Sequence, residues 1–504
     1  MRPWRDHLDP DDPATTDDRH GMWDLTAAAT LPQLWVRRWV EVPTAPLWFE
    51  DGRWWTAGEF EEATRRAAGR LRTAGLAPGE RIVWSTDSTV DGLVAHVGAL
   101  RAGLVVVPAN PAYSARELAH IVTDARATAA WVGRPEQAEW VRTTGSRRIV
   151  VTGPGLELPD GDPGTIDRTR PDDPALIAYT SGTTGAPKGA VLRHRNLLAG
   201  VESVIRAWRM TPEDRLVHCL PIFHAHGLVV GAYGTMTAGG SAVLLPGFDA
   251  VGVADAVVAH RTSLFFGVPT MYHRLVASGR AGDLASLRLC VSGSAPLSAE
   301  LHAAASSAIG SVVLERYGMT ETLMNTSNPY VGERRAGTVG FALPGVEVTL
   351  DDRGEVLLRG PNVFDGYFER DAANSEAFRD LGDGGGQWFA TGDLGSDDDG
   401  YLVIRGRSKE LIISGGFNVY PTEVEDVLSG CPGVAEVAVT GTPSDEWGEM
   451  VTAWVVPDGT APSLDDLRAH CAGLLAPYKQ PRSVRVVDAL PRNSLGKVVR
   501  SQLG

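Results

Sequence analysis

The segment from Tyr179 to Gly189 combines residue types that could hold a polyphosphate. Its glycines would let backbone N–H groups approach phosphate oxygens, its hydroxyl side chains would donate hydrogen bonds, and Lys188 would add a positive charge. The simpler alternative is a flexible surface loop of small polar residues. The common nucleotide-triphosphate loop does not fit, because the spacing from Gly182 to Lys188 differs and Gly189 stands where that loop requires Ser or Thr. A predicted strand before the segment and a predicted helix after it favour phosphate binding.

Four further polar segments could contribute to the same kind of site. We expect each of them at the carboxyl end of a strand, where open parallel sheets bind ligands. Taken singly, a Thr-Gly-Asp or a Gly-Arg would be interpreted as a turn. The interpretation therefore depends on their joint occurrence in one chain, as Ser292–Pro296, Glu315–Thr322, Thr391–Asp393 and Arg405–Lys409.

Alternating helical and apolar strand patterns must position these segments. Residues 175–178 predict a strand before the first segment, and residues 191–204 predict a helix after it. The same alternation runs through much of the first 300 residues and predicts an α/β fold, with parallel sheets flanked by helices. From about residue 337 short strands and Gly, Pro and Asp turns predict a small β-subdomain. A compact α/β segment of about a hundred residues closes the chain.

The length of 504 residues exceeds what one core supports, so several domains are expected. We expect a polar arm at 1–22, a large domain at 23–406 with its β-rich subdomain at 337–406, and a small mobile domain at 407–504. In the Trp-rich region after the arm, Trp35 and Trp39 lie four residues apart on one helical face. This spacing favours core packing over ligand stacking.

Composition excludes several classes of partner. The net charge is −15 and no Lys/Arg block stands out, which argues against nucleic acid and anionic membrane surfaces. No run of eighteen apolar residues occurs, so membrane insertion is not expected. The cysteines are scattered without a C-x-x-C pair, which predicts reduced thiols in a cytoplasmic protein and neither disulfides nor zinc; they are Cys219, Cys290, Cys431 and Cys471.

In their order along the chain, these segments resemble the adenylate-forming (AMP-binding) superfamily, which includes acyl-CoA synthetases, luciferases and peptide-synthetase adenylation domains. The resemblance covers nearly the whole chain from about residue 30 and includes a C-terminal motif, Pro491–Lys497. Within the superfamily, Met324–Tyr330 and Ile413–Pro421 look most like malonyl-CoA synthetases. The resemblance implies an AMP-forming acid:CoA ligase, which activates a carboxylic acid with ATP to acyl-AMP and transfers the acyl group to the thiol of coenzyme A.

The resemblance also implies roles for individual residues. Glu321 and Thr184 would ligate Mg²⁺, and Asp393, helped by Arg407, would hold the ribose. Lys497 would reach the α-phosphate and the substrate carboxylate, where charge neutralisation is the main catalytic need. The remaining residues implied in nucleotide binding are Thr180, Ser181, Gly182, Thr183, Gly185, Lys188, Ser294, Ala295, Glu315, Tyr317, Gly318 and Thr320.

On the acyl and thiol side, the resemblance implies a catalytic role for His224 and a pantetheine tunnel at Gly415 and Gly416. The implied acyl pocket consists of His224, Val230, Gly267, Ser292, Gly293, Met319 and Met324. Because Lys497 and the tunnel segment cannot face one acyl carbon together, we expect the small domain to rotate about a hinge at Lys409 between the half-reactions. His218 and His226 have no support in the motif and are interpreted as structural.

The identity of the acid stays open from sequence. A malonate-like acid needs a cation for its second carboxylate, and Arg274 and Arg288 are the candidates. The wall around the predicted pocket is largely small or apolar, so a bulky hydrophobic acid fits equally well.

The reaction also has alternatives. One is an enzyme of a single half-reaction, either adenylation for a carrier protein or thioester formation from supplied acyl-AMP. A luciferase-type oxygenase and a nucleotide-binding regulator are others. The expected partners are the acid, ATP and CoA, in a monomer or homodimer.

Overall fold

The computed structural model describes residues 29–144, 149–154, 157–162, 164–180, 187–414, 417–444, 446–492 and 497–503. The chain divides into two compact units. The large unit comprises Met1–Val348 and Leu358–Phe389, and the small unit comprises Thr349–Leu357 and Ala390–Gly504. The α/β class is confirmed, with a large unit of parallel sheets and helices and a smaller C-terminal α/β unit. The domain boundaries expected at 22 and 406 stay predictions.

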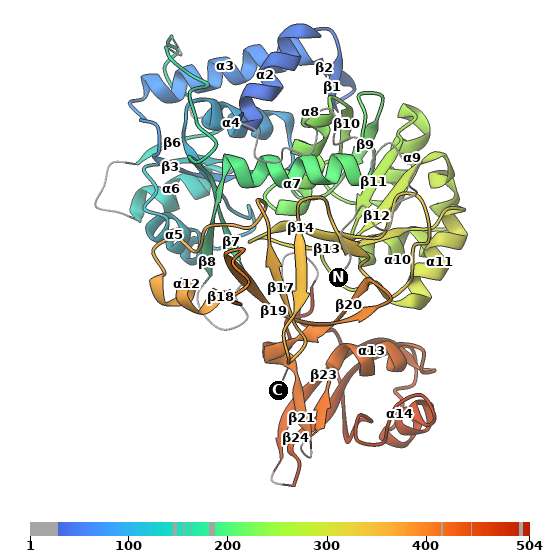
Figure 1. Ribbon diagram of the computed structural model, residues 1–504. Coiled ribbons are helices and arrows are strands. Elements are labelled where there is room, and N and C mark those ends of the chain that lie inside the picture. Colours follow the sequence, from blue (N-terminus) through green and yellow to red (C-terminus); the bar gives the residue numbers. More distant parts are fainter. Residues whose placement is uncertain are drawn as a thin grey trace. The chain divides into compact units, whose positions relative to one another are not determined.

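A nine-stranded sheet forms one half of the large unit (Figure 1). Its central strands are parallel, and its edges are antiparallel at the β1–β2, β13–β14 and β14–β15 pairs. Strands buried on both faces are typical of parallel sheets, and β10, β11 and β12 are accordingly buried along their whole length and mostly apolar. The strand order is β15 (Phe341–Ala342), β14 (Leu323–Ser327), β13 (Leu314–Met319), β12 (Leu289–Ser292), β11 (Leu264–Gly267), β9 (Arg215–His218), β10 (Ser241–Leu244), β1 (Pro46–Glu50) and β2 (Arg53–Thr56).

A six-stranded sheet forms the other half of the large unit and carries the first polar segment. All its pairs are parallel except the last, β7 with β8, which is an antiparallel hairpin with Tyr179 opposite Gly189 and Thr180 opposite Lys188. The strand order is β6 (Val150–Thr152), β5 (Ala129–Val132), β3 (Arg81–Ser85), β4 (Val105–Pro108), β7 (Pro174–Thr180) and β8 (Lys188–Arg193).

The helix predicted directly after the first polar segment begins later than expected. Residues 188–193 are strand β8, and helix α7 (His194–Ala207) follows. The prediction from Val191 was wrong because this short run is stabilised by pairing with β7, with Ala190 and Leu192 buried on one face. The helix starts where the Asn196 side chain accepts a hydrogen bond from the Arg193 N–H at 2.9 Å.

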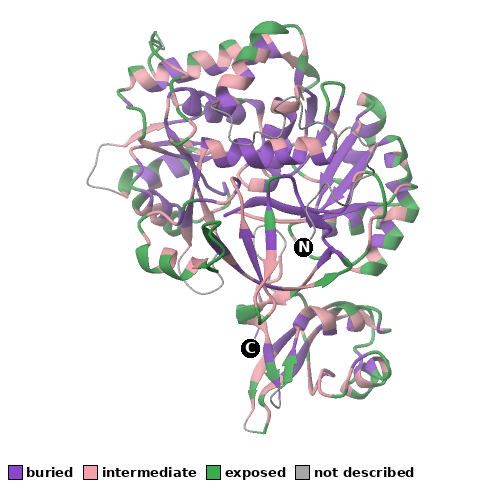
Figure 2. Cartoon of the chain, viewed as in Figure 1, coloured by how far each residue is buried: buried purple, intermediate pink, exposed green. Residues whose placement is uncertain are grey.

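Helices cover both sheets of the large unit (Figure 1). Helices α9 to α11 pack on one face of the nine-stranded sheet around Phe265 and Cys290, and α5 and α6 pack on the six-stranded sheet around Val83 and Ile177. The central strands of both sheets and the inward helix faces are largely buried (Figure 2). The helices are α2 (Leu31–Glu41), α3 (Ala57–Thr73), α4 (Val90–Arg101), α5 (Ala115–Asp124), α6 (Pro135–Thr143), the π-helix η3 (His226–Tyr233), α8 (Gly234–Ala238), α9 (Ala250–His260), α10 (Pro269–Ala277), η4 (Ala281–Ser286), α11 (Ala299–Ile309) and α12 (Asp371–Ala377).

The predicted packing role of the paired tryptophans agrees with the structure. Trp35 and Trp39 are 1% and 2% exposed, and their rings stack with centroids 6.2 Å apart. Trp39 also meets Phe60 of α3 edge-on. The two indoles therefore anchor α2 in the core of the large unit.

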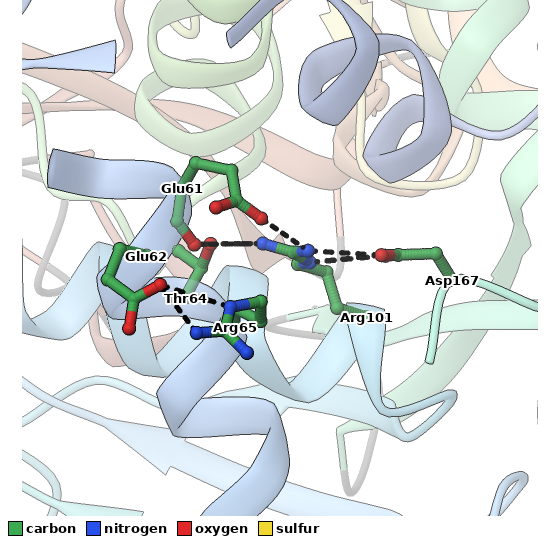
Figure 3. Close-up of polar contacts among 6 residues, drawn as sticks. All are labelled: Glu61, Glu62, Thr64, Arg65, Arg101 and Asp167. Carbon is green, nitrogen blue, oxygen red and sulfur yellow. Dashed lines mark hydrogen bonds and ion pairs between the residues drawn. The ribbon is translucent and has the colours of Figure 1, made fainter. Parts of the chain in front are cut away.

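A buried arginine ties three segments of the large unit together (Figure 3). Arg101, at the end of α4, pairs with Asp167 at 3.1 Å and with Glu61 of α3 at 2.9 Å. It also donates to the Thr64 hydroxyl at 2.8 Å. Because its side chain is only 2% exposed, these bonds replace the water that the guanidinium loses. The cluster fixes the segment that leads into β7.

The small unit has its own sheet and core. Strands β21 to β25 and helices α13 and α14 enclose Val424, Val451 and Leu467. Salt bridges from Arg500 to Glu410 and Glu425 attach the C-terminal turn. The elements are β20 (Tyr401–Arg407), η5 (Ser408–Glu410), β21 (Ile412–Ser414), β22 (Phe417–Val419), α13 (Pro421–Ser429), β23 (Val434–Ser444), β24 (Gly448–Pro457), α14 (Leu464–Cys471), β25 (Ser483–Val486) and η6 (Arg500–Gln502).

The predicted β-rich subdomain contains β16 (Glu347–Leu350), β17 (Glu355–Arg359), β18 (Phe378–Asp380) and β19 (Gln387–Asp398). The division between the units falls within β16, β17 and β19. Three segments expected as strand-end loops lie in strands instead, because backbone pairing outweighs their turn-forming residues. Residues 315–319 belong to β13, residues 391–393 to β19 and residues 405–407 to β20.

In the described ranges no helix is long and apolar enough to cross a membrane.

Candidate functional site

The β7–β8 hairpin presents the two described ends of the predicted phosphate loop. Thr180 ends β7 and Lys188 begins β8 directly opposite it. The Lys188 ammonium lies 5.1 Å from the centroid of the Tyr367 ring, a cation–π contact that orients the charge. The predicted ligands between these ends fall outside the described residues; they are Ser181, Gly182, Thr183, Thr184 and Gly185.

Glu321 occupies the turn between β13 and β14 and is 7% exposed. The Tyr367 hydroxyl donates a hydrogen bond to its carboxylate at 2.9 Å. Tyr367 therefore connects the lysine of the phosphate hairpin with the predicted metal ligand. A single buried carboxylate suits Mg²⁺, which keeps several waters and is usually completed by substrate phosphates. In the part of the chain that the structure describes, no cluster of three or more metal-ligating side chains occurs.

The loop after β12 carries the second polar segment, as predicted. Ser292 ends the strand, and its buried hydroxyl has no hydrogen-bond partner among the described residues. Ser294 has φ of 71°, a left-handed conformation that non-glycine residues rarely adopt and that is typical of functional loops. Glu315 of β13 accepts a hydrogen bond from the Leu297 N–H at 3.0 Å and so holds this loop from the neighbouring strand. Ala295, between these contacts, is half-buried.

Residues 317–324 form a tight connection from β13 into β14. A Cβ added to Gly318 would collide with the backbone oxygen of Leu323, so only glycine fits there. Tyr317, Met319 and Thr320 are half-buried along this connection, and Met324 is buried at the start of β14.

Arg316 is the residue that sequence reasoning missed. It is 4% exposed, and burial lowers the pKa of its guanidinium to about 9. Its Nε and Nη2 make no hydrogen bond to any part of the chain that the structure describes. A Cβ on Gly293 would lie 2.5 Å from the Arg316 Cζ, so the absence of a side chain at Gly293 leaves room for the guanidinium. A buried, unpaired cation is costly and calls for an anion.

His226 lies within electrostatic range of this guanidinium, and His218 and His224 interact in turn with His226. His226 opens the π-helix η3, and its Nδ1 lies 3.2 Å from the Ser294 hydroxyl. Burial and the charge of Arg316 hold the pKa of His226 well below its usual value. Burial also lowers the pKa of His218 and of His224 to about 4. All three imidazoles are therefore neutral near pH 7.

Two other predicted acyl-pocket residues, Val230 and Gly267, lie in η3 and at the end of β11. Val230 is buried within η3. A Cβ on Gly267 would meet the Phe265 ring at 3.0 Å and the Tyr272 ring at 3.2 Å, so this glycine accommodates core packing.

Arg274 and Arg288, which the sequence suggested as ligands of a second carboxylate, are not the arginine beside the Ser292–Ser294 segment. Arg288 precedes β12, whereas the Ser292–Ser294 segment follows it, and Arg288 is already paired with Asp214 through its Nε at 2.6 Å. Arg274 is exposed on α10. The sequence signal for Arg316 was the presence of two charged residues, Glu315 and Arg316, in an otherwise apolar strand.

The small unit brings together three residues that lie far apart in sequence. Asp393 and Arg407 face each other across β19 and β20, with 3.1 Å between Oδ1 and Nε. Lys497 interacts electrostatically with both. Burial and the neighbouring Arg407 lower the pKa of Lys497, while Asp393 opposes that shift. A partly desolvated lysine of this kind is suited to neutralise an anionic ligand.

Of the remaining predictions, Lys409 is exposed in the short turn η5. Gly415 and Gly416, predicted to line the CoA tunnel, lie outside the described residues, as do residues 493–496.

Comparison with known proteins finds that the chain is similar to AMP-binding enzymes over most of its length. The sequence model for the AMP-binding enzyme matches residues 35–368, and that for the AMP-binding enzyme C-terminal domain matches residues 423–497. A feruloyl-CoA synthase of Amycolatopsis sp is 36% identical, with 93% of this chain and 97% of that protein covered. The mitochondrial malonate–CoA ligase ACSF3 of Mus musculus is 34% identical, with coverage of 84% and 81%. The crystal structure of ATP-bound MatB from Rhodopseudomonas palustris is 39% identical, with coverage of 94% and 98% and a TM-score of 0.86.

Proposed function

The chain belongs to the AMP-binding enzyme family, and we propose that it is an AMP-forming acid:CoA ligase for a short acid with a second anionic group, of which malonate is the simplest. The single observation that carries the choice of acid is the buried, unpaired guanidinium of Arg316. A distal carboxylate or sulfonate would supply the missing hydrogen bonds and charge. A bulky hydrophobic acid would leave this cation unsatisfied.

In the first half-reaction the carboxylate oxygen of the acid attacks the α-phosphorus of ATP, and pyrophosphate leaves. Because both reactants are anions, the protein has to neutralise charge and align the groups. We assign this to Lys497, to Lys188 and to backbone N–H groups of the 181–186 segment. Mg²⁺ near Glu321 would supply further charge neutralisation.

In the second half-reaction the CoA sulfur attacks the acyl carbon and AMP leaves. An ordinary thiol has a pKa near 8.5, so a useful thiolate fraction exists without a dedicated base. A protein nucleophile is not needed, and the four cysteines are buried and form no disulfide bonds. Burial raises the pKa of Cys219 and of Cys290 to about 12, which makes these thiols inert.

A substrate panel tests this proposal. We expect pyrophosphate release and CoA thioester with malonate, methylmalonate or sulfoacetate, and much lower kcat/KM with acetate, propionate, octanoate or ferulate. Preference for ferulate or octanoate would contradict the choice of acid. Pyrophosphate without thioester would favour transfer to a carrier, and thioester only from supplied acyl-AMP would favour a non-adenylating enzyme.

The variant Arg316→Met tests the residue that carries the proposal. We expect kcat/KM for malonate to fall roughly a hundredfold, as for loss of charged hydrogen bonds of about 1.5–3 kcal/mol, while KM for ATP stays unchanged. The variant should be at least as stable as the wild type, because methionine removes a buried charge. Arg274→Met, an exposed arginine, is the matched control. A raised KM for ATP with unchanged acid preference would assign Arg316 to the nucleotide.

A further inference from the structure

His226 has one ring nitrogen engaged and the other available. Its Nδ1 lies 3.2 Å from the Ser294 hydroxyl, which orients the imidazole. Its Nε2 is buried and has no hydrogen-bond partner within the described residues. An unpartnered buried ring nitrogen costs free energy in the free protein, so it is a natural position for a ligand.

The groups that act electrostatically on His226 are cationic or neutral. They are Arg316 from β13, His218 from β9 and His224 from the segment before η3. Near pH 7 the two imidazoles are neutral, so only the charge of Arg316 disfavours a second positive charge. Burial is the largest cause of the low pKa of His226. In the free protein His226 is therefore neutral while Arg316 is charged.

We propose that His226 is a second ligand of the acid's distal anionic group, and that it binds this group as an imidazolium after taking up a proton. This rests on the proposed function, because it requires an anion beside Arg316. That anion would compensate the guanidinium and place a negative charge beside the imidazole, which favours the imidazolium against the cost of burial. The imidazolium would then donate from Nε2, and Arg316 would donate from Nε and Nη2, to one carboxylate or sulfonate.

Two consequences follow for binding. Each dianionic acid that binds should take up close to one proton, and its Kd should rise by up to about tenfold per pH unit above neutrality, because the proton becomes scarcer. Acetate shares the reacting carboxylate but has no distal anion. It should therefore bind without this proton and with little dependence on pH.

Isothermal titration calorimetry measures both quantities. Malonate and acetate are titrated into the full chain with Mg²⁺ and the unreactive analogue α,β-methylene-ATP, at pH 7.5, in phosphate and in Tris, whose ionisation enthalpies differ. At this pH Arg316 is already protonated and contributes no proton uptake. We expect uptake near one proton for malonate in the wild type, near zero for acetate, and near zero for malonate with His226→Gln.

His218→Gln is the matched control, since it also replaces a buried histidine with an unpartnered Nε2. It should keep the proton uptake, and unchanged affinity for the ATP analogue in both variants would show that they are folded. Malonate binding without proton uptake in the wild type would overturn the inference and leave the proposed function intact, as would uptake that persists in His226→Gln. Acetate binding with no malonate binding would overturn the proposed function itself and this inference with it.

Discussion

A few residues of the large unit have buried polar atoms without a hydrogen-bond partner among the described residues. Most buried polar groups in folded proteins have a partner, so each unpaired one needs a reason. At Arg316, His226 and Ser292 such atoms gather beside the loop after β12, and the strained Ser294 lies among them. This concentration is typical of a binding site and unlike ordinary core packing.

Replacing Lys497 tests the division between the half-reactions. We expect Lys497→Ala to reduce acid-dependent pyrophosphate release by roughly a hundredfold or more, as for loss of a charged transition-state contact. Thioester formation from supplied acyl-AMP should be spared, because the carboxylate is already activated there. Single-turnover assays of each step measure the two rates. Arg485→Ala, an exposed cation of the same unit, should leave both unchanged, and equal loss of both steps in Lys497→Ala would refute the division.

At the scale of elements, two antiparallel connections carry much of the large unit's candidate site. The β7–β8 hairpin supplies Lys188, and the β13–β14 connection supplies Glu321. Both are additions to largely parallel sheets, and Tyr367 bridges them by contacting the lysine and the glutamate. Their relative position therefore depends on Tyr367, which is itself held against β8 by an isolated antiparallel bridge to Ala190.

The Arg101 cluster gives a stability prediction at this scale. We expect Asp167→Asn to lower the free energy of unfolding of the large unit by about 2 kcal/mol, because the buried guanidinium loses a charged partner. Urea denaturation measures the loss. Glu62→Gln is the control, since the exposed Glu62–Arg65 pair in Figure 3 should contribute less than about 0.5 kcal/mol. Equal losses of unfolding free energy in the two variants would mean that burial of Arg101 does not increase the contribution of its ion pair to stability.

At the scale of the whole molecule, each unit has a core of its own. The large unit packs around the clusters that include Val217 and Val83, and the small unit packs around Val451. Chains of this kind commonly unfold in more than one step. The net charge of −15 acts at this scale too, because an anionic ligand must be held by a local group of cations and not by the overall charge of the chain.

Calorimetry of two core variants tests this independence. We expect two thermal transitions, the smaller in enthalpy belonging to the small unit. Val451→Ala should lower only the smaller transition and Val217→Ala only the larger, each through a cavity worth about 2 kcal/mol. A single transition that shifts equally in both variants would show that the units unfold together.

Much of the fold could be predicted because its signals are local. Apolar runs and helical periodicity placed most strands and helices, and the Trp35–Trp39 spacing predicted their burial correctly. Where local preference competes with pairing, prediction failed. Residues 188–193 joined β7 as a strand, and the Tyr317 and Asp393 segments lie in strands although their glycines suggest turns.

By itself the sequence determined which candidate groups the chain carries: a predicted phosphate-binding segment, a carboxylate at Glu321, and the motifs of Asp393, Arg407 and Lys497 in family order. Only the tertiary structure decided which arginine lacks a partner. Arg288 and Arg316 are the same residue type on neighbouring strand segments, yet Asp214 pairs with the first and no described carboxylate pairs with the second. Pairing and burial depend on contacts between residues far apart in sequence, so no local pattern could distinguish the arginine that is paired from the one that has no described partner.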